Sequence, residues 1–455
     1  MTAERACMKC LILAAGKGSR LRQRADSKPL LKLLGVPLIE RVIRNAAEAG
    51  IREFVVVTGH QEPQVREFLT GLARRLALPI HTAHNPEWQN SENGRSILAA
   101  RHLLRQEDSF LLTMADHLME PALIGRVLDA APPPAGGVLL AVDGEIANPL
   151  VDREDVTRVH RDDDRITAIG KGLEPFDGYD TGLFLCTPGL FGALERSAER
   201  GDSSLSGAVA RLAEESRAGA VAADGLFWCD VDDEAALGRA EEALLQRLRG
   251  KQHDGPVSRL LNRPLSIRIS RWLAGSPVTP NQISLFSFAL SLLAACLFTL
   301  GGYAALALGG VLAQLASIVD GCDGEIARLK YQGSDFGGWF DAVLDRYADA
   351  LLLFGLTWHA WREGGAEPAL LLGFAAITGS FMLSYTADKY DGLMRRLESG
   401  KRGVSWRMGR DLRVFLIMLG AVLHLPLLIL GVIALLMNLE TLRRIWICRP
   451  RTTAP

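Results

Sequence analysis

The sequence predicts an α/β domain with a mostly parallel sheet, followed by an all-α membrane domain of six transmembrane helices. Up to about Gly250, short apolar runs alternate with amphipathic stretches, which is typical of strands alternating with helices. From Asn281 onward, long apolar stretches recur and are separated by short loops rich in arginine or glycine. A chain of 455 residues is also too long for one ordinary domain.

The composition assigns the two halves to different surroundings. We place a soluble domain at residues 1–248, a linker and juxtamembrane helix at 249–277, and the membrane domain at 278–455. A net charge of −1 argues against a nucleic-acid partner, which usually requires a concentrated basic excess. The apolar stretch Leu11–Ala15 is too short for a signal peptide, so the soluble half is expected in the cytoplasm. The seven scattered cysteines look reduced and structural.

A glycine-rich turn lies near the N-terminus. The stretch "CLILAAGKGSRL", Cys10 to Leu21, predicts a short buried strand whose glycine turn opens a helix. Gly16 and Gly18 allow main-chain N–H groups to approach an anion, and Arg20 and Lys28 add positive charge nearby. A tight βα turn without any ligand is the alternative interpretation.

Carboxylates follow two later apolar strands. Asp116 comes just after "FLLTM", and "FWCDVDD" places Asp230 and Asp232 after another strand. Ligands of parallel sheets gather at the carboxyl ends of the strands, where the glycine turn also lies. A carboxylate from each group would hold one Mg²⁺ against a triphosphate. Each aspartate, taken alone, is also a common helix cap.

These stretches together resemble the sugar-phosphate-type nucleotidyltransferases over about the first 245 residues, through "LAAGKGSRL", "KPL", Asp116 and "WCDVDD". The resemblance implies a Rossmann-like α/β nucleotidyltransferase fold in which Asp116 and either Asp230 or Asp232 bind the metal. Arg20 and Lys28 would assist the reaction. "NSENGRSILAAR" and "IGKGLEPFDGYDTGLFLC" resemble segments beside the base and the acceptor. The implied nucleotide- and substrate-binding residues are Ala14, Ala15, Gly16, Gly18, Ser19, Arg20, Lys28, Asn93, Ser96 and Lys171.

Six apolar stretches follow, at about 281–301, 303–321, 338–360, 367–387, 411–424 and 426–441. The loop that begins "KYDGLMRRLESGKRG" is dense in lysine and arginine, so the positive-inside rule predicts that it faces the cytoplasm. Six spans then return the C-terminus to the same side as the soluble half. Before the first span, "VSRLLNRPLSIRISRWLAG" has the pattern of an amphipathic helix at the membrane surface, and "RGKQHDGP" is the expected linker.

Four aspartates lie at neighbouring ends of the second and third stretches. Asp320 and Asp323 are three residues apart, and Asp341 and Asp345 are four apart, so each pair lies on one helix face. Four uncompensated carboxylates at membrane depth would repel one another and lose hydration, a conflict that bound divalent cations resolve. The small residues nearby leave room for a nucleotide. The alternative is that these acids pair with Arg328, Lys330 and Arg346, or cap helix ends.

The spacing D-G-x-D-G-x-x-A-R, eight residues, G-x-x-x-D-x-x-x-D resembles the signature of the CDP-alcohol phosphotransferases. The resemblance implies that Asp320, Asp323, Asp341 and Asp345 hold metal ions, and that Asp345 is also the base that activates the acceptor hydroxyl. Gly324, Ala327 and Arg328 would contact the cytidine diphosphate. "TPNQIS", Thr279 to Ser284, resembles the start of this family's first span. Further candidates, for an acceptor phosphate, are Lys389, Arg410 and Arg413, whose charges also suit a solvated loop.

The whole chain resembles the bifunctional inositol-1-phosphate cytidylyltransferases and di-myo-inositol-phosphate-phosphate synthases. This implies that CTP and inositol 1-phosphate give CDP-inositol, whose phosphoinositol group is then transferred to a second inositol 1-phosphate with release of CMP. Mg²⁺ is the expected ion in both domains, with Mn²⁺ as an alternative, and the membrane half is expected to form a homodimer. Transfer to a lipid such as diacylglycerol is the second enzymatic interpretation. An ion pathway or receptor joined to a nucleotide sensor is the non-enzymatic one.

Overall fold

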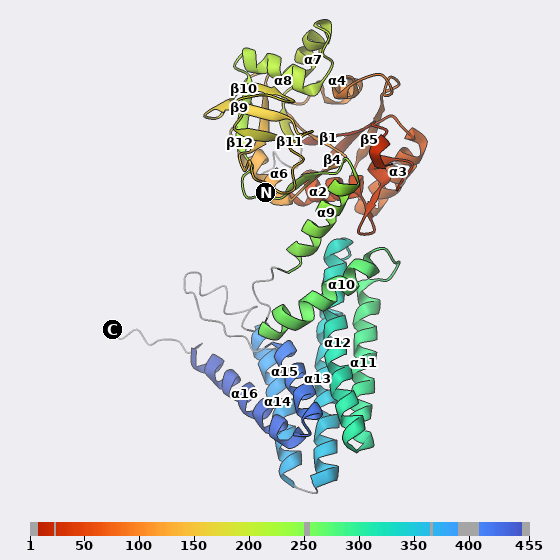
Figure 1. The fold of residues 1–455 in the computed structure, drawn as a ribbon, viewed down its shortest axis with the longest axis vertical. Helices are drawn as coiled ribbons and strands as arrows, with labels where there is room; N and C mark the ends of the chain where they lie inside the picture. The colour runs from red at the N-terminus through yellow and green to blue at the C-terminus, as the bar shows by residue number, and fades with distance from the viewer. Residues whose placement is uncertain (1–7, 22–23, 250–254, 365–366, 390–408, 448–455) are drawn as a thin grey trace, which may run out of the picture. The chain divides into compact units, whose positions relative to one another are not determined.

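The computed structural model describes residues 8–21, 24–249, 255–364, 367–389 and 409–447. The chain divides into two compact units, Met1–Ala243 and Leu244–Pro455 (Figure 1). The first unit contains all the strands of the described residues, and the second is helical.

A nine-stranded sheet forms the centre of the first unit. Its spatial order is β5 (Ile80–His84), β4 (Glu53–Thr58), β1 (Lys9–Ala14), β6 (Phe110–Met114), β11 (Gly178–Cys186), β8 (Val138–Asp143), β12 (Ala218–Ala222), β10 (Arg165–Gly170) and β9 (Arg158–Asp162). Every residue of β1 from Cys10 to Ala14 is buried, although alternate residues point to opposite faces. Both faces of the sheet are therefore covered at β1, as an α/β domain requires.

The sheet is mixed, so the prediction of a mostly parallel sheet is wrong. Strands β5, β4, β1 and β6 are parallel to one another, and β8 is parallel to β12. Strand β11 is antiparallel to β6, β8 and β9, and β10 is antiparallel to β9 and β12. No helix is present in residues 144–177, all of which the structure describes. Without the crossover helix that a parallel pair needs, the chain returns through the β9–β10 hairpin and runs antiparallel.

The helices of the first unit lie between these strands in sequence. They are α2 (Leu38–Glu48), α3 (Glu62–Leu76), α4 (Asn93–Ala99), α5 (Arg101–Leu104), α6 (Pro121–Asp129), α7 (Gly189–Glu199), α8 (Leu205–Glu214) and α9 (Glu234–Arg247), the last of which ends in the second unit. Two small strand pairs complete it, β2 (Lys32–Leu33) with β3 (Val36–Pro37) and β7 (His117–Met119) with β13 (Trp228–Asp230). The β7–β13 pair is important for function, because it brings the segment after β6 beside the segment that holds Asp230 and Asp232.

Six helices occupy the six apolar stretches predicted in the second unit: α11 (Pro280–Leu300), α12 (Tyr303–Leu329), α13 (Asp335–Gly364), α14 (Glu367–Lys389), α15 (Arg410–Val422) and α16 (Pro426–Ile447). Within the described residues, α11, α12, α14 and α16 are long and apolar enough to cross a membrane. Helix α13 is long but carries acidic residues in its first half, and α15 has 13 described residues.

Helix α12 extends eight residues beyond the predicted end of its apolar stretch at 321, to Leu329. Asp320 and Asp323 therefore lie inside the helix, although residues 320–324, Asp-Gly-Cys-Asp-Gly, are poor helix formers, because tertiary packing overrides intrinsic propensity. Helix α11 begins at Pro280 with Thr279 as its N-cap, and the Thr279 and Gln282 side chains form a capping box.

The juxtamembrane stretch forms η3 (Ser258–Asn262) and α10 (Arg263–Ala274). Asn262, Arg263, Ser266 and Ser270 are buried, whereas Arg268 and Arg271 are exposed. Glu325 of α12 is fully buried and accepts hydrogen bonds of 2.7 Å from Arg263 Nη1, Ser266 Oγ and Ser270 Oγ. Leu260 and Trp272 lie on the outside and are 83% and 80% exposed. An exposed face that combines these apolar side chains with arginines suits a helix at the membrane surface.

Candidate functional sites

A cavity of about 510 Å³ lies beside the carboxyl ends of β1 and β6 in the first unit. It is lined by nine of the residues predicted from sequence: Ala15, Gly16, Arg20, Asn93, Ser96, Asp116, Lys171, Asp230 and Asp232. The resemblance therefore selected residues that are far apart in sequence and lie around one cavity. The other predicted nucleotide-binding residues, Ala14, Gly18, Ser19 and Lys28, are not part of its lining.

The glycine turn after β1 has two distinct glycines. Gly16 is exposed, and a Cβ there would have open space. Gly18 has φ +60°, and a Cβ there would collide with the side chain of Lys28. Glycine is therefore required at position 18 for both backbone conformation and space. The expected helix is present only as the 3-10 turn η1 (Ser19–Leu21) within the described residues.

Lys28 lies between carboxylates from both acidic segments. Its Nζ is 2.5 Å from Asp116 Oδ2 and also contacts Asp232 Oδ1. Burial of the amine favours its neutral form, but Asp116, Asp232 and Asp230 together raise the pKa of Lys28 above its usual value. Burial likewise opposes ionisation of Asp116, but Lys28 and His117 lower the pKa of that carboxyl. Lys28 thus acts as a built-in counterion of the acidic cluster.

Sequence reasoning missed His117 and Asp180. His117 Nδ1 lies 2.9 Å from Asp116 Oδ1 and 3.7 Å from Asp230 Oδ1. Burial opposes protonation of the ring, but Asp230, Asp116 and Asp180 raise the pKa of His117 to about 9. Its ring packs on Gly182, which has φ +73° and follows the irregular register of β11. Histidine directly after Asp116 was the available signal, whereas the approach of Asp180 depends on that local distortion.

A second charged group lines another part of the cavity wall. Asp155 accepts hydrogen bonds from Arg20 Nη1 at 2.8 Å and from Lys171 Nζ at 2.5 Å. These two cations lower the pKa of Asp155 to about 2. Arg20 and Lys171 are therefore held by one carboxylate at the cavity, although they are far apart in sequence. Such paired cations suit an anionic phosphate group.

The acidic cluster of the soluble half fits a divalent metal ion. One ligand atom from each of Asp116, His117 and Asp230 lies within 4.8 Å of the others. Asp230 Oδ1 is buried and has no hydrogen-bond partner. Burial, with the charges of Asp116 and Asp232, raises the pKa of Asp230 to about 7. A buried carboxylate oxygen without a partner is costly, and a metal ion would satisfy it.

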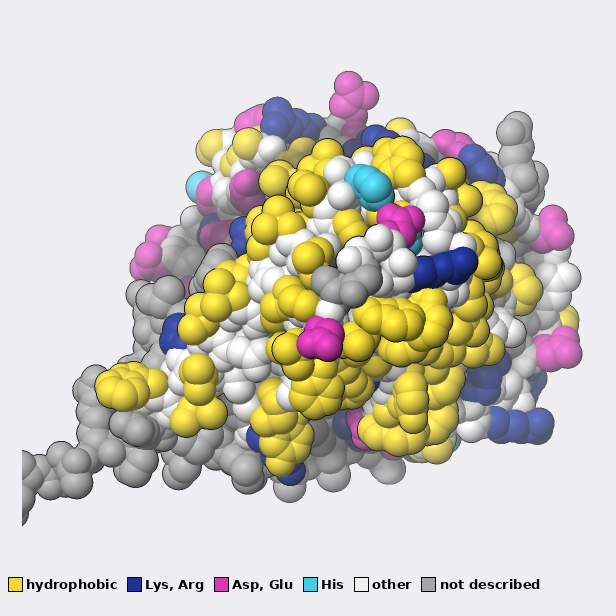
Figure 2. Space-filling view, turned by 90° about the horizontal axis from the view of Figure 1, so that it is seen from below, with side chains coloured by type: hydrophobic (Ala, Val, Ile, Leu, Met, Phe, Trp, Pro, Cys, Tyr) yellow, Lys and Arg dark blue, Asp and Glu magenta, His cyan; other side chains and the backbone are white. Residues whose placement is uncertain are grey.

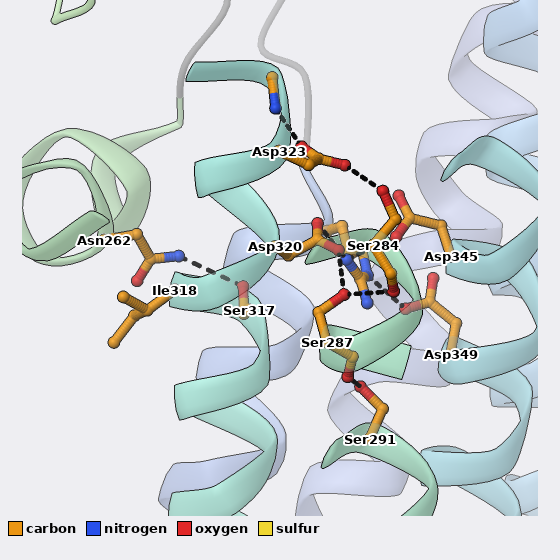
Figure 3. A network of polar contacts seen from close by, with 12 residues as sticks. Asn262, Ser284, Ser287, Ser291, Ser317, Ile318, Asp320, Asp323, Asp345 and Asp349 are labelled. Carbon is orange, nitrogen blue, oxygen red and sulfur yellow. Dashed lines mark hydrogen bonds and ion pairs between the residues drawn. The ribbon is translucent and has the colours of Figure 1, made fainter. Parts of the chain in front are cut away.

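Three of the four membrane-domain aspartates converge. Carboxylate oxygens of Asp320, Asp341 and Asp345 lie within 4.8 Å of one another, although α12 supplies the first and α13 the other two. Figure 3 shows Asp320 and Asp345 facing the same polar network, with Asp323 nearer the end of α12. Asp323 accepts hydrogen bonds from Ser284 Oγ at 2.6 Å and from the Gly324 amide.

Helix α11 contributes serines that the sequence analysis did not assign to the site. Ser287 Oγ donates to Asp320 Oδ1 at 2.9 Å, and Ser284 binds Asp323 as described above (Figure 3). Ser284 ends the "TPNQIS" stretch, so part of that signal was present. The predicted neighbours Gly324, Ala327 and Arg328 lie on the next turns of α12, and a Cβ on Gly324 would meet Arg328 Nη1 at 3.3 Å.

Arg410 is the cation that neutralises the aspartates. Its Nη1 lies 2.7 Å from Asp320 Oδ2 and 2.6 Å from Asp345 Oδ1, and its Nε lies 3.3 Å from Asp349. Asp349 also accepts from Arg413 Nη2 at 2.6 Å. Two of the alternative cations, Lys330 and Arg346, have other partners.

Lys330 donates to the carbonyls of Ser276 and Val278, and Arg346 pairs with Asp388. Asp349 was missed, although it continues the four-residue spacing of Asp341 and Asp345. Lys389, predicted near the acceptor phosphate, places its Nζ over the Tyr385 ring, 5.8 Å from the ring centroid. The rest of the basic loop, residues 390–408, lies outside the described residues, as does most of the expected linker.

The membrane-domain cluster also fits divalent cations. Asp341 Oδ1 is buried without a hydrogen-bond partner, while its cluster partners Asp320 and Asp345 share the single guanidinium of Arg410. Oxygen donors from several carboxylates are the ligand set that Mg²⁺ and similar hard ions prefer. The geometry thus leaves one carboxylate oxygen for which a metal ion is the natural partner.

Comparison with known proteins gives a consistent assignment for both halves. The family described as MobA-like NTP transferase domain matches residues 10–170, and the family described as CDP-alcohol phosphatidyltransferase matches residues 277–446. A protein of Rubrobacter xylanophilus named "Bifunctional IPC transferase and DIPP synthase" is 38% identical over 95% of both chains. An Aquifex aeolicus protein with the same name is 32% identical over 96% of this chain and 97% of its own. "Archaetidylinositol phosphate synthase" of Pyrococcus horikoshii is 33% identical over 28% of this chain and 62% of its own.

The two sites and these matches define the class of protein: an enzyme in which a nucleotidyltransferase domain precedes a CDP-alcohol phosphotransferase domain in the membrane. Because full-length relatives are 32–38% identical over about 95% of the chain, the chain belongs to the family of bifunctional IPC transferases and DIPP synthases.

Proposed function

We propose that the soluble half joins CTP to inositol 1-phosphate. In this reaction the phosphate oxygen of inositol 1-phosphate attacks the α-phosphorus of CTP, CDP-inositol forms, and pyrophosphate leaves. Gly16 and Gly18 shape the turn at which the triphosphate binds, together with Ala14, Ala15 and Ser19. Lys28 and Arg20 balance its charge, and Asn93 and Ser96 contact the nucleotide. Lys171 faces the acceptor phosphate. Position and charge neutralisation are sufficient for this chemistry.

The membrane half then uses CDP-inositol as the donor. Asp345 takes the proton from a hydroxyl of a second inositol 1-phosphate, whose oxygen attacks the phosphorus that carries inositol, and CMP leaves. The product is a phosphodiester that joins two inositols and retains one terminal phosphate. The convergence of Asp320, Asp341 and Asp345 on one point carries this proposal. Gly324, Ala327 and Arg328 contact the cytidine diphosphate. Arg410 and Arg413 neutralise the negative charge of the acceptor phosphate.

Divalent ions, Mg²⁺ with Mn²⁺ as an alternative, would neutralise the phosphate oxygens in both domains. Asp116 with Asp230 or Asp232 would hold them in the soluble half. Asp320, Asp323, Asp341 and Asp345 would hold them in the membrane half. The buried oxygens of Asp230 and Asp341 that have no hydrogen-bond partner support both assignments.

We further propose six membrane spans, with the soluble half and the basic loop in the cytoplasm and domain limits at 1–248, 249–277 and 278–455. The count of lysine and arginine in residues 389–413 supports this orientation. A homodimer through the membrane half follows from the family resemblance. Cysteine labelling from either side of sealed vesicles tests the orientation, and cross-linking in membranes tests the dimer.

The decisive experiment gives CTP and labelled inositol 1-phosphate to membranes that contain the protein. Asp345→Asn is expected to abolish CMP release while labelled CDP-inositol accumulates. Asp116→Ala is expected to stop the first reaction, and added CDP-inositol restores product formation. Asp388→Asn, which changes an exposed aspartate of α14, serves as the matched control. Normal CMP release by Asp345→Asn would refute the assignment of the base.

Transfer to a lipid acceptor is the second candidate function. It is favoured by the position of the aspartates on membrane helices and by the similarity of this half to a relative whose name denotes lipid synthesis. The same incubation separates the two functions, because the label partitions either into water as a diester or into the organic phase as a lipid.

A further inference from the structure

Two histidines and a glutamate meet at the end of the membrane bundle opposite to the aspartates. His359 and Glu363 lie one turn apart near the end of α13, and His424 follows α15 in the turn before α16. One ligand atom from each lies within 4.8 Å of the others. His359 follows Asp345 by fourteen residues (359 − 345) on the same helix, which corresponds to about 21 Å. This cluster is therefore separate from the phosphotransferase site.

The hydrogen bonds at this cluster orient its histidine for ligation. His359 Nδ1 lies 3.2 Å from the carbonyl oxygen of Phe298, which accepts the Nδ1 hydrogen. Nε2 of the neutral ring then carries the lone pair. A backbone carbonyl that binds the second ring nitrogen is the usual support of a metal-binding histidine. In a similar way, the Gly302 amide donates to Glu363 Oε1 at 2.9 Å and leaves Oε2 toward the histidines.

The ligand atoms of the cluster face one another in an arrangement that a cation would stabilise, although His424 Nε2 already lies within hydrogen-bond distance of Glu363 Oε2, at 3.3 Å. His359 is fully buried, and its Nε2 has no hydrogen-bond partner, although Glu363 Oε2 is 3.3 Å away. An imidazole nitrogen and a carboxylate oxygen so close together repel unless a proton or a metal ion lies between them, and the metal ion can also bind His424. The nearby Arg362 does not supply it, because its Nη1 donates to the carbonyls of Thr299 and Leu300.

The distances suit a tetrahedral metal ion. His359 Nε2 and His424 Nε2 are each 3.3 Å from Glu363 Oε2. Bonds of about 2.0–2.1 Å that meet at a tetrahedral angle place two ligand atoms about 3.3 Å apart. Two imidazoles with one carboxylate favour a borderline ion such as Zn²⁺ over Mg²⁺ or Ca²⁺. His424 and Glu363 keep 52% and 36% of their side chains exposed, so an ion can enter from solvent.

From these observations we propose that His359, Glu363 and His424 form a binding site for a divalent transition-metal ion, with Zn²⁺ as the most suitable ion and water as its fourth ligand. The ion would join the end of α13 to the α15–α16 turn, and the Gly302 amide already attaches Glu363 to the α11–α12 turn. Figure 2 shows this end of the bundle as a mainly hydrophobic face in which a few histidine, acidic and basic side chains are gathered. The role of the ion is to hold the end of α13, the α15–α16 turn and the α11–α12 turn together.

Co²⁺ binding to the purified full-length protein in detergent tests the site. The protein is stripped with a chelator and returned to excess Mg²⁺, which occupies the aspartate sites, and is then titrated with Co²⁺. The expected result is one equivalent of Co²⁺ with the intense visible bands of tetrahedral coordination, displaced by Zn²⁺. Zn²⁺ should also raise the melting temperature of the wild type, because it binds the folded state.

Two variants and one control locate the binding. His424→Asn and Glu363→Gln are each expected to weaken Co²⁺ binding by roughly 100-fold and to abolish the Zn²⁺-dependent rise in melting temperature. Asparagine accommodates the left-handed backbone of residue 424, where φ is +58°. Glu367→Gln, an exposed change at the first residue of α14, should leave binding unchanged. Tetrahedral bands of equal strength in either variant, or octahedral Co²⁺ alone in the wild type, would overturn the proposal.

Discussion

The contact between α10 and α12 depends on Glu325, and its neutralisation gives a measurable prediction. Glu325 is fully buried and accepts three hydrogen bonds of 2.7 Å from α10. Glu325→Gln keeps the shape of the side chain but removes the charge opposite Arg263. Removing one partner of a buried ion pair costs about 3–5 kcal/mol. We expect this cost to fall on the docking of α10, because all three bonds cross between the two helices.

Hydrogen exchange measures this local cost directly. A loss of about 3–5 kcal/mol corresponds to roughly 100- to 4,000-fold faster exchange of the α10 amides, up to the limit set by global unfolding. Ser270→Ala removes one hydrogen bond to a charged group, about 1.5–3 kcal/mol, and should accelerate exchange by roughly 10- to 150-fold. Glu367→Gln changes an exposed glutamate of the same domain and should have no effect on α10.

The double variant Arg263→Met, Glu325→Gln completes the test. A buried ion pair replaced on both sides is often nearly neutral, so exchange in the double variant should return toward the wild-type rate. Exchange of α10 within about tenfold of wild type in Glu325→Gln would refute the reasoning, since it would mean that the charge does not hold the helix. A double variant no slower in exchange than the single one would also refute it.

Three further predictions concern other parts of the molecule. Gly18→Ala should lower CDP-alcohol formation at least tenfold and leave transfer from added CDP-alcohol unchanged. The reason is that residue 18 has a left-handed backbone and its new Cβ would collide with Lys28. Gly125→Ala, in open space within α6, is the control. Removing divalent ions with EDTA should reduce both product formation and CMP release to background, and Mg²⁺ alone should restore both in a discontinuous assay. Brominated lipids should quench the fluorescence of Trp272, so the total quenching should be smaller in Trp272→Phe than in the wild type. Equal quenching in the wild type and the variant would place α10 away from lipid.

The sequence was most informative where function depends on local spacing. Asp320 and Asp323 on one helix face, and Asp341 and Asp345 on the next, follow from the helical repeat alone. The convergence of Asp320 with Asp341 and Asp345 requires that α12 and α13 both pack against α11, an arrangement that the helical repeat alone does not determine. The ends of elements were less predictable, because α12 continues past its apolar run to Leu329.

Partners set by tertiary packing were not predictable. The alternative counterions suggested by the sequence were the nearby Arg328, Lys330 and Arg346, whereas Arg410 of α15, a candidate for the acceptor phosphate, is the side chain that contacts Asp320 and Asp345. Nothing in local spacing distinguishes a cation 65 residues after Asp345 (410 − 345) from the other arginines around it. Similarly, the mixed sheet results from a hairpin excursion between β8 and β11, whose direction depends on strand pairing rather than on hydrophobic pattern.

The two sites solve the same electrostatic problem in the same way. Carboxylates that are to hold a metal ion must lie close together and partly buried, so the protein without metal would be destabilised by their repulsion. Lys28 in the soluble half and Arg410 in the membrane half each contact two of these carboxylates and supply the missing charge. In both clusters one carboxylate oxygen is left without a hydrogen bond, in Asp230 and in Asp341. Each site is therefore compensated enough to fold without metal and incomplete enough to bind it.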